Sequence, residues 1–342
     1  HSWWNGFWSH VITDWDEINA PSPIGEDAVE GLNMDWRRFV THQTLDFYRH
    51  EVASVRSVTP DLPVTTNFHD FINIGQSIDY WAFADDIDVI SWDNYPLWHN
   101  DRRSDEEEAA RRAFIHNICR SFKQKPFLLL ESCPGPTNWQ PVAKLPKPGV
   151  VGLSSMQAVS LGSDSVQFFQ VKRSLGGSEK FHGALIDHYP TNKTRIHREA
   201  EALGSDLARL GGLQGARTEA RAAIIYDWEN KWALDNVQGL NRHREDYFDF
   251  CVGQYRPLWE RGVAVDVLKM GASFAGYKLV IAPMLYMLPE AVAGELRRFV
   301  EGGGTLVTGP FSGVVDENLL CYTNGRPGPM RDLLGIWSEE TD

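Results

Sequence analysis

The chain has 342 residues, 33 of them basic and 46 acidic, and its formal net charge at pH 7 is -13. A surface with this excess of acidic groups repels nucleic acids and anionic membranes, which excludes proteins that bind phosphate backbones without sequence preference. No apolar run approaches the roughly 20 residues of a transmembrane helix, so we expect neither a nucleic-acid nor a membrane partner.

The four cysteines are widely spaced and form no C-x-x-C pair, so the sequence predicts neither a zinc site nor a redox motif. Free thiols of this kind fit a reducing environment, and we expect a cytoplasmic protein. Because the sequence opens on His1 rather than Met, this expectation leaves room for a signal peptide upstream.

Four apolar runs in the first half of the chain alternate with stretches of helical pattern. The runs are rich in Val, Ile, Leu and Phe, which is typical of strands buried on both faces of a parallel sheet. Strand and helix in alternation indicate a parallel α/β fold. The predicted strands are Pro63–Phe68, Ile87–Trp92, Pro126–Glu131 and Val166–Gln170, and the predicted helices are Asp35–Val58, Ser104–Phe122 and Gly149–Leu161.

Two of these helices are predicted from specific signals. Ser104 followed by Glu107 forms a capping box, which marks the start of a helix. Asp35–Val58 carries apolar residues at helical spacing, which indicates one apolar face. The residues of this pattern are Trp36, Phe39, Phe47 and Val55.

Polar side chains recur at the carboxyl ends of the predicted strands, namely Asn67, Asp93, Glu131 and Gln170. In a TIM barrel this face carries the active site, and a doubly wound sheet also binds ligands there. Neither a G-x-G-x-x-G nor a P-loop motif is present, which favours the barrel. Because four strands are half of a barrel, we expect its first half upstream of His1.

The glycine-containing stretch Ala200–Thr218 is predicted to separate this part from a second α/β unit. We therefore place the barrel part within residues 1–210 and the second domain within residues 217–342. Its helices are predicted at Glu245–Arg261 and Pro289–Glu301, each followed by glycine. Its predicted strands are Ala222–Tyr226, Ala264–Leu268, Leu279–Pro283 and Thr305–Thr308.

Glu131 is the strongest candidate for chemistry, because this carboxylate directly follows the apolar run Phe127–Leu130. The alternative is an ion pair at the barrel rim, and residue type alone does not choose between them. Trp139 lies on a Pro/Gly-rich loop and either stacks on a sugar or anchors that loop. Glu179 and His182 are three residues apart, a spacing that suits adjacent hydroxyl groups, whereas a lone E-x-x-H is weak evidence for a metal site.

Several segments of the chain match one known family in the same order. They are Trp4–Pro21, Ile87–Pro96, Phe127–Trp139, Gly162–His182 and Ile225–Trp232. The chain resembles glycoside hydrolase family 42, the β-galactosidases, over nearly its whole length. The resemblance implies a TIM barrel, a flavodoxin-like (amidotransferase-like) trimerisation domain and a homotrimer. It also implies retaining hydrolysis of terminal β-D-galactosides, including oligosaccharides, with no cofactor.

The resemblance further implies roles for individual residues. Glu131 matches the nucleophile of the family. Trp139, Glu179 and His182 match sugar-contacting residues, Phe169 matches a pocket-lining aromatic, Trp8 matches a Trp that closes the sugar site, and Tyr95 matches a further pocket residue.

The chain departs from the family pattern in one respect. The acid/base of the family is the Glu of an Asn-Glu pair at the end of the fourth barrel strand, and this sequence has no such pair. We therefore expect the acid/base and the zinc-binding cysteines of the family upstream of His1, and its last β-domain after Asp342. The chain by itself should then bind no metal and be inactive, because proton donation to the leaving group is missing.

Two other interpretations stay open. The same machinery could act on another sugar, such as an α-L-arabinopyranoside, in a different retaining glycosidase. Alternatively, the chain is a non-catalytic assembly fragment, since the second unit has no nucleophilic residue at its strand ends. We predict that this unit forms oligomer contacts through exposed aromatic residues, namely Trp228, Trp232 and Trp337.

Overall fold

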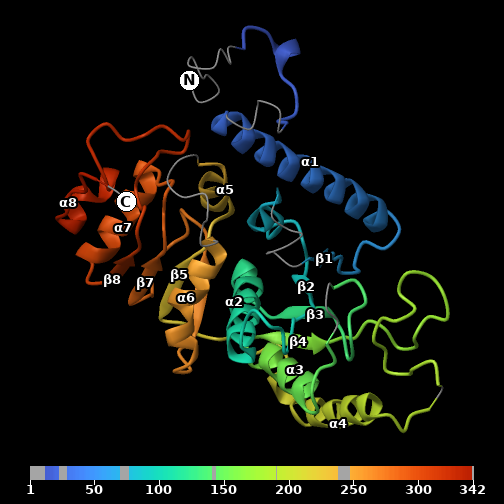
Figure 1. Ribbon diagram of the computed structural model, residues 1–342. Coiled ribbons are helices and arrows are strands. Elements are labelled where there is room, and N and C mark those ends of the chain that lie inside the picture. The colour runs from blue at the N-terminus through green and yellow to red at the C-terminus, as the bar shows by residue number, and fades with distance from the viewer. Residues whose placement is uncertain are drawn as a thin grey trace. The chain divides into compact units, whose positions relative to one another are not determined.

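The computed structural model of the chain describes residues 12–22, 29–69, 77–140, 144–189, 191–237 and 247–340 (Figure 1). The described residues fall into two compact units, each built around one sheet. The first-sheet unit lies within Asp61–Gly75 and Ala84–Glu219. The second-sheet unit lies within His1–Pro60, Gln76–Phe83 and Ala220–Asp342.

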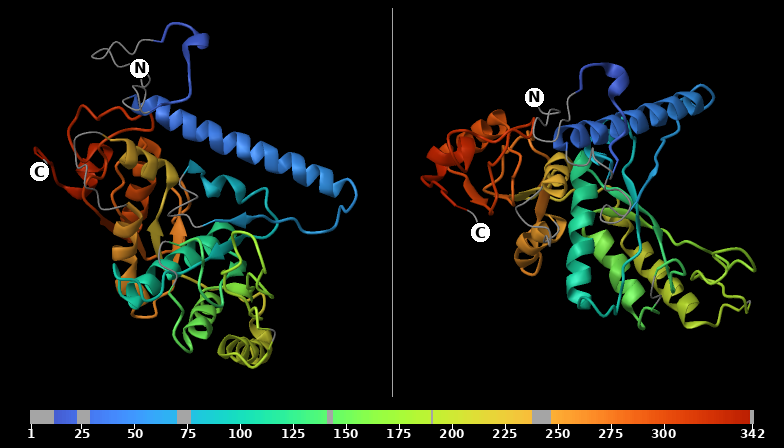
Figure 2. Two further views of the ribbon diagram at one scale, coloured as in Figure 1. Left: turned by 45° about the vertical axis from the view of Figure 1, so that its right-hand side comes forward. Right: turned by 45° about the horizontal axis from the view of Figure 1, so that its top comes forward.

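The first-sheet unit contains four parallel strands in the order β1-β2-β3-β4. Their bounds are β1 Asn67–Phe68, β2 Ser91–Asn94, β3 Phe127–Ser132 and β4 Ser163–Val166. Its helices are α2 Asp105–Lys123, α3 Val150–Ser160 and α4 Arg195–Arg209, followed by a short 3-10 helix, η5 Gly211–Leu213. This arrangement confirms the predicted parallel α/β fold. Helices α3 and α4 lie side by side in both views of Figure 2, and α3 contacts β4.

Helix α2 begins at the predicted capping box. Ser104 Oγ accepts a hydrogen bond from Glu107 N at 3.2 Å, and Glu107 Oε2 accepts one from Ser104 N at 2.8 Å. These contacts satisfy two of the free N–H groups at the start of the helix. The helix ends at Lys123, and the next residue, Gln124, has a left-handed conformation.

A layer of aromatic rings packs the first sheet against α2. The ring of Phe127 stacks on His116 with centroids 5.6 Å apart, and the ring of Trp92 contacts His116 edge-on at 5.1 Å. Phe68 contacts Phe122 in the same way at 5.8 Å. Because side chains alternate along a strand, this packing directs Asn67, Ser91 and Asp93 to the opposite face. The polar residues of the sheet therefore share one face.

The fourth predicted strand is displaced in the structure. It was expected at Val166–Gln170, but β4 comprises Ser163–Val166, so its last residue is not Gln170. The hydrogen bonding explains the difference, because an irregular extension follows β4 alongside β3. In it Gln167 N donates to Leu129 O at 3.1 Å, and Phe169 N donates to Ser132 O at 2.9 Å.

The stretch Ala200–Thr218 is not a linker throughout. Its first half belongs to α4, a helix that the sequence analysis did not predict. Thr194 caps this helix by accepting a hydrogen bond from His197 N at 3.2 Å. The domain boundary between residues 210 and 217 stays a prediction.

The second-sheet unit contains four parallel strands in the order β6-β5-β7-β8. The strands are β5 Ala222–Ile225, β6 Val265–Leu268, β7 Leu279–Ala282 and β8 Thr305–Thr308, within one residue of the prediction at every end. The helices are α1 Glu30–Arg56, α5 Trp228–Asn236, α6 Tyr247–Trp259, α7 Glu290–Glu301 and α8 Arg331–Leu334, with 3-10 helices η1 Trp15–Glu17, η4 Tyr80–Phe83 and η6 Gly328–Met330. Buried aliphatic residues of β5, β7 and α7 form its core.

Helix α1 covers the predicted helix Asp35–Val58, but the expected apolar face is the wrong one. The predicted apolar residues are largely exposed; they are Trp36, Phe39, Phe47 and Val55. The apolar residues of α1 that are buried are Leu32, Met34, Leu45, Tyr48 and Val52. The helix thus carries apolar residues on two faces. The spacing of apolar residues does not show which face is buried, and the prediction took the more aromatic one. Among the described residues no helix has both the length and the hydropathy to cross a bilayer.

The predicted exposure of three tryptophans is wrong for two of them. Trp228 is 1% exposed and Trp232 is 0% exposed, because both belong to α5 and pack inside the second-sheet unit. Trp228 contacts the rings of Tyr80 and Tyr226 edge-on. Trp337 is 59% exposed and is the member of this group that remains available for contacts.

The carboxyl edge of the second sheet, where α/β sheets often bind ligands, is closed by side chains of α5. Asn230 Nδ2 donates to Met284 O at 2.9 Å, and Asn230 Oδ1 accepts from Met287 N at 3.0 Å. Asp227 accepts from Asn230 N at 3.1 Å and from Met270 N at 3.0 Å. These contacts tie the loops after β6 and β7 to the start of α5.

We expect Asn230→Ala to destabilise the purified protein by roughly 2–4 kcal/mol, because two buried backbone groups lose their partners. Chemical denaturation monitored by tryptophan fluorescence measures this change. Asn318→Ala is the matched control, because Asn318 is exposed and its loss should change stability by less than about 0.5 kcal/mol. Equal stability of the two variants would contradict the assigned role of Asn230.

Candidate active site

The side chain of Glu131 is directed by an extra residue in β3. Leu129 pairs with Trp92, and the next paired residue is Glu131, opposite Asp93. Leu130 is therefore left without a partner across the ladder, as in a β-bulge. In a regular strand Glu131 would follow Phe127 and Leu129 toward α2. The bulge instead turns it to the face that carries Asp93.

Two side chains hold the Glu131 carboxylate on this face. Tyr95 OH donates to Oε2 at 2.6 Å, and Asn67 Nδ2 donates to Oε1 at 3.3 Å. The same Asn67 nitrogen donates to Asp93 Oδ1 at 2.9 Å. One amide group thus bridges two carboxyl groups that come from neighbouring strands. Both donors suit a carboxylate that acts as an acceptor.

Asp93 lies beside Glu131 and is only 3% exposed. Burial, with a further contribution from the charge of Glu131, raises the pKa of Asp93 to about 7, although the hydrogen bond from Asn67 opposes the shift. Near neutral pH Asp93 is therefore partly protonated. The site consists of the Glu131 side chain next to a carboxyl group, Asp93, that readily holds a proton.

The structure gathers most of the predicted site residues around Glu131. The ring of Tyr95 contacts Trp139 at 5.3 Å and His182 at 5.9 Å, both edge-on, and Phe169 contacts His182 at 5.1 Å. Trp139 is 52% exposed, whereas His182 is fully buried. An exposed aromatic ring next to buried polar groups is the kind of surface on which the apolar face of a sugar ring stacks.

Glu179 and His182 occupy one turn, since His182 N donates to Glu179 O at 2.9 Å. This agrees with the expectation that the two residues are neighbours on one turn. Trp8, the remaining predicted site residue, lies outside the residues that the structure describes.

The loops that carry Trp139 and His182 are locked together by two glycines. Gly183 N donates to Pro136 O at 2.7 Å. A Cβ atom on Gly183 would lie 2.7 Å from Gly135 Cα and 2.8 Å from Cys133 Sγ. Only glycine allows this approach of the two backbones. The contact fixes the distance between the loop after β3 and the loop after β4.

The contacts of three polar residues of the site were not predicted from the sequence. Asn67 and Asp93 belonged to the polar strand ends noted above, but nothing in the sequence indicated that one amide would bridge two carboxyl groups. Asn138 precedes Trp139, and its side chain contacts both Ser178 and His182.

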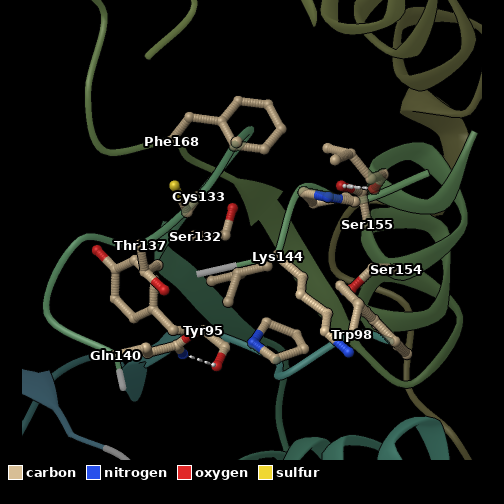
Figure 3. Close-up of a pocket in the computed structure, with 15 residues that line it drawn as sticks. Tyr95, Trp98, Ser132, Cys133, Thr137, Gln140, Lys144, Ser154, Ser155 and Phe168 are labelled. Atoms are coloured by element: carbon tan, nitrogen blue, oxygen red, sulfur yellow. Dashed lines mark hydrogen bonds between the residues drawn. The ribbon is translucent and has the colours of Figure 1, made fainter. Parts of the chain in front are cut away.

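A small cavity lies next to the site on the side of Tyr95 and α3 (Figure 3). Its volume is about 30 Å³, which suits a single water molecule and not a sugar ring. Ser132, Ser155 and Lys144 are among its polar lining groups. Gln140 Nε2 donates to Tyr95 O at 3.3 Å at its border, which supports the backbone of Tyr95.

The chain matches two family models. Residues 1–210 match the model described as β-galactosidase, and residues 220–342 match the model described as β-galactosidase trimerisation domain. The chain is 51% identical to β-galactosidase Pbg of Clostridium perfringens and 49% identical to β-galactosidase BglY of Alicyclobacillus acidocaldarius. It is covered completely in both comparisons, and it spans about half the length of these relatives (50% and 49%).

Solved structures give the same result. The β-galactosidase of Rahnella sp. R3 superimposes on 99% of this chain with a TM-score of 0.95 and 49% identity, over 50% of its own chain. The catalytic mutant of Gan42B, a family 42 β-galactosidase from G. stearothermophilus, covers all of this chain with a TM-score of 0.96 and 45% identity, again over 50% of its own chain.

We expect Asp93→Asn to stabilise the protein at pH 8 and to change its stability little at pH 4. The pKa of Asp93 is about 7 in the folded protein, against about 3.9 in an unfolded chain, so the charged side chain costs stability as the pH rises between these values. Asparagine has no charge to bury and removes that loss, which is on the order of 1–3 kcal/mol.

Urea unfolding of both proteins at the two pH values measures the effect. Other buried acids with a raised pKa, such as Asp79 and Asp227, contribute equally to both proteins and cancel in the difference. Asp61→Asn is the control, because Asp61 is exposed. The assignment fails if Asp93→Asn destabilises the protein equally at pH 4 and pH 8.

Proposed function

Because the chain belongs to glycoside hydrolase family 42, the β-galactosidases, we propose that the protein containing it hydrolyses terminal non-reducing β-D-galactosides with retention of configuration. The observation that carries this proposal is Glu131, turned by the bulge in β3 onto a polar face and held by Tyr95 and Asn67. A carboxylate placed in this way is available as a nucleophile.

In the proposed first step a Glu131 oxygen attacks the anomeric carbon, and the bond from that carbon to the leaving-group oxygen breaks. The leaving group takes a proton from a second carboxyl group, which in retaining enzymes lies roughly 5–5.5 Å from the nucleophile. Water then attacks the anomeric carbon of the glycosyl ester, the second group accepts its proton, and the bond from that carbon to the Glu131 oxygen breaks. We assign this second role to the acid/base that the family resemblance predicts, not to Asp93, which is buried beside Glu131.

The aromatic residues define the sugar site in this proposal. Trp139 provides an exposed ring for the apolar face of galactose, while Tyr95 and Phe169 border the buried His182. Glu179 and His182 are assigned to hydroxyl groups. We expect no cofactor, because attack and proton transfer need only carboxyl groups.

We also propose that the first sheet is part of a TIM barrel and that the second-sheet unit has a flavodoxin-like fold. The strand order β6-β5-β7-β8 supports the latter, since the first strand of such folds lies between the second and the third. A trimerising role for this unit and a cytoplasmic location complete the proposal. The exposed Trp337 supports association, and Arg331 lies over its ring at 5.8 Å.

We expect Glu131→Gln in the complete enzyme to lower kcat/KM for a nitrophenyl β-galactoside at least about a thousandfold, because an amide is a poor nucleophile. Folding should be nearly unchanged, since the amide keeps the shape of the side chain. Steady-state kinetics and a melting curve test both statements. Glu301→Gln, at an exposed position, is the control. Activity of Glu131→Gln within tenfold of the parent would refute the assignment.

We expect the complete enzyme to be a homotrimer by light scattering and Trp337→Glu to shift it toward smaller species. A charge placed in an apolar contact costs association energy. Gln214→Glu, at an exposed position without an aromatic ring, is the control and should leave the trimer intact. A wild-type monomer would contradict the trimer itself, whereas an unchanged trimer in Trp337→Glu would exclude Trp337 from the interface.

A further inference from the structure

The amide of Asn138 lies between two groups, and only one orientation of the amide fits both of them. Its Nδ2 donates to the backbone oxygen of Ser178 at 2.6 Å, and its Oδ1 lies 3.2 Å from Nδ1 of His182. A backbone carbonyl can only accept a hydrogen bond, so the NH2 group must face Ser178. The amide oxygen therefore faces His182.

This orientation determines where the proton of His182 lies. An amide oxygen accepts, so His182 Nδ1 must carry the hydrogen. Burial lowers the pKa of His182, with a smaller contribution from Arg173 in the same direction, while Glu179 and Glu131 oppose the shift. The imidazole is therefore neutral near pH 7, and Nε2 is left with a free lone pair. Nε2 is buried and has no hydrogen-bond partner in the described part of the chain.

The surroundings keep the ring in this orientation. Tyr95 and Phe169 contact it edge-on, and Arg173 Nε donates to the backbone oxygen of His182 at 3.0 Å. The neighbouring Gly183 is clamped against Gly135. The ring cannot turn over without the loss of these contacts. Because His182 is fully buried, a hydroxyl group can reach Nε2 only if a neighbouring ring such as Tyr95 or Phe169 shifts.

We propose that Asn138 is a positioning residue that fixes His182 as the Nδ1–H tautomer, so that Nε2 accepts a hydrogen bond from one hydroxyl group of the galactoside. The inference rests on the proposed function, because it takes the substrate from there. It adds the direction of the contact, since the protein accepts and the sugar donates. A buried acceptor without a partner is unfavourable, and substrate binding removes that penalty.

Substrate analogues distinguish the two directions of such a bond. Replacement of a hydroxyl group by hydrogen removes both donor and acceptor, whereas replacement by fluorine removes the donor and keeps a weak acceptor. If Nε2 accepts, both analogues bind worse by a similar factor. If Nε2–H donates, the fluorine compound binds better than the hydrogen compound.

The experiment uses the complete enzyme and methyl β-D-galactosides with hydrogen or fluorine at position 3, 4 or 6, measured as competitive inhibitors of nitrophenyl galactoside hydrolysis. Binding avoids the effect of fluorine on the rate of bond cleavage. We expect one position at which both analogues bind roughly three- to tenfold worse than the parent sugar. In Asn138→Ala this loss should shrink at the same position, because the tautomer is no longer fixed.

Asn138→Asp gives a stricter test. A carboxylate beside Nδ1 raises the pKa of His182, so the imidazolium with a hydrogen on Nε2 is favoured at low pH. At pH 5 the fluorine analogue should then bind better than the hydrogen analogue, and the preference should disappear at pH 8. Asn318→Asp introduces the same charge at an exposed position and should show a smaller preference at pH 5 than Asn138→Asp.

Neutron diffraction from crystals of the unmodified complete enzyme supplies a readout that needs no variant. Deuterium on Nδ1 and not on Nε2 of His182 is expected. Deuterium on Nε2 would overturn the proposal. So would a wild-type enzyme that binds the fluorine analogue as well as the parent sugar at every position where the hydrogen analogue binds worse. If the parent galactoside is neither bound nor hydrolysed, the proposed function is wrong. The assigned tautomer of His182 is still tested in that case, because neutron diffraction needs no substrate.

Discussion

The extra residue in β3 is the constraint on which the candidate site depends. Side chains alternate along a strand. Because Phe127 and Leu129 point toward α2, every second side chain of a regular strand would do the same. Without the unpaired Leu130, the carboxylate of Glu131 would enter that apolar layer, where an isolated charge is very costly. The bulge lets one short strand serve both the aromatic layer against α2 and the polar face shared with Asn67 and Asp93.

Two asparagine amides organise the polar face in complementary ways. Asn67 uses its nitrogen to bridge two carboxyl groups, which offsets part of the repulsion between Asp93 and Glu131. Asn138 uses both ends of its amide and so determines the proton position on His182. The buried acid Asp93 next to Glu131 lowers the stability of the fold at neutral pH. Functional sites commonly keep such unfavourable groups because the surrounding packing holds them in place.

Much of the framework could be predicted from the sequence, because it depends on local signals. The strands of the second sheet and the capping box of α2 are of this kind. A bulge shifts the register by one residue without a change in composition, so the bulge that turns Glu131 to the polar face could not be predicted. Periodicity also chose the wrong face of α1, and aromatic content suggested exposure for Trp228 and Trp232, which are buried. The contacts of Asn67 and Asn138 depend on residues 26 to 64 positions away, and no local pattern records them.

The contact between Gly135 and Gly183 has a consequence for how such a site can diversify. Because the backbones touch, the inner parts of the two loops behave as a single block, and a side chain at Gly183 would push the two loops apart. Change is therefore confined to the outer part of the second loop, where Leu175 and Phe181 are exposed. Selection can alter the outer surface there while the geometry around Glu131 is inherited intact.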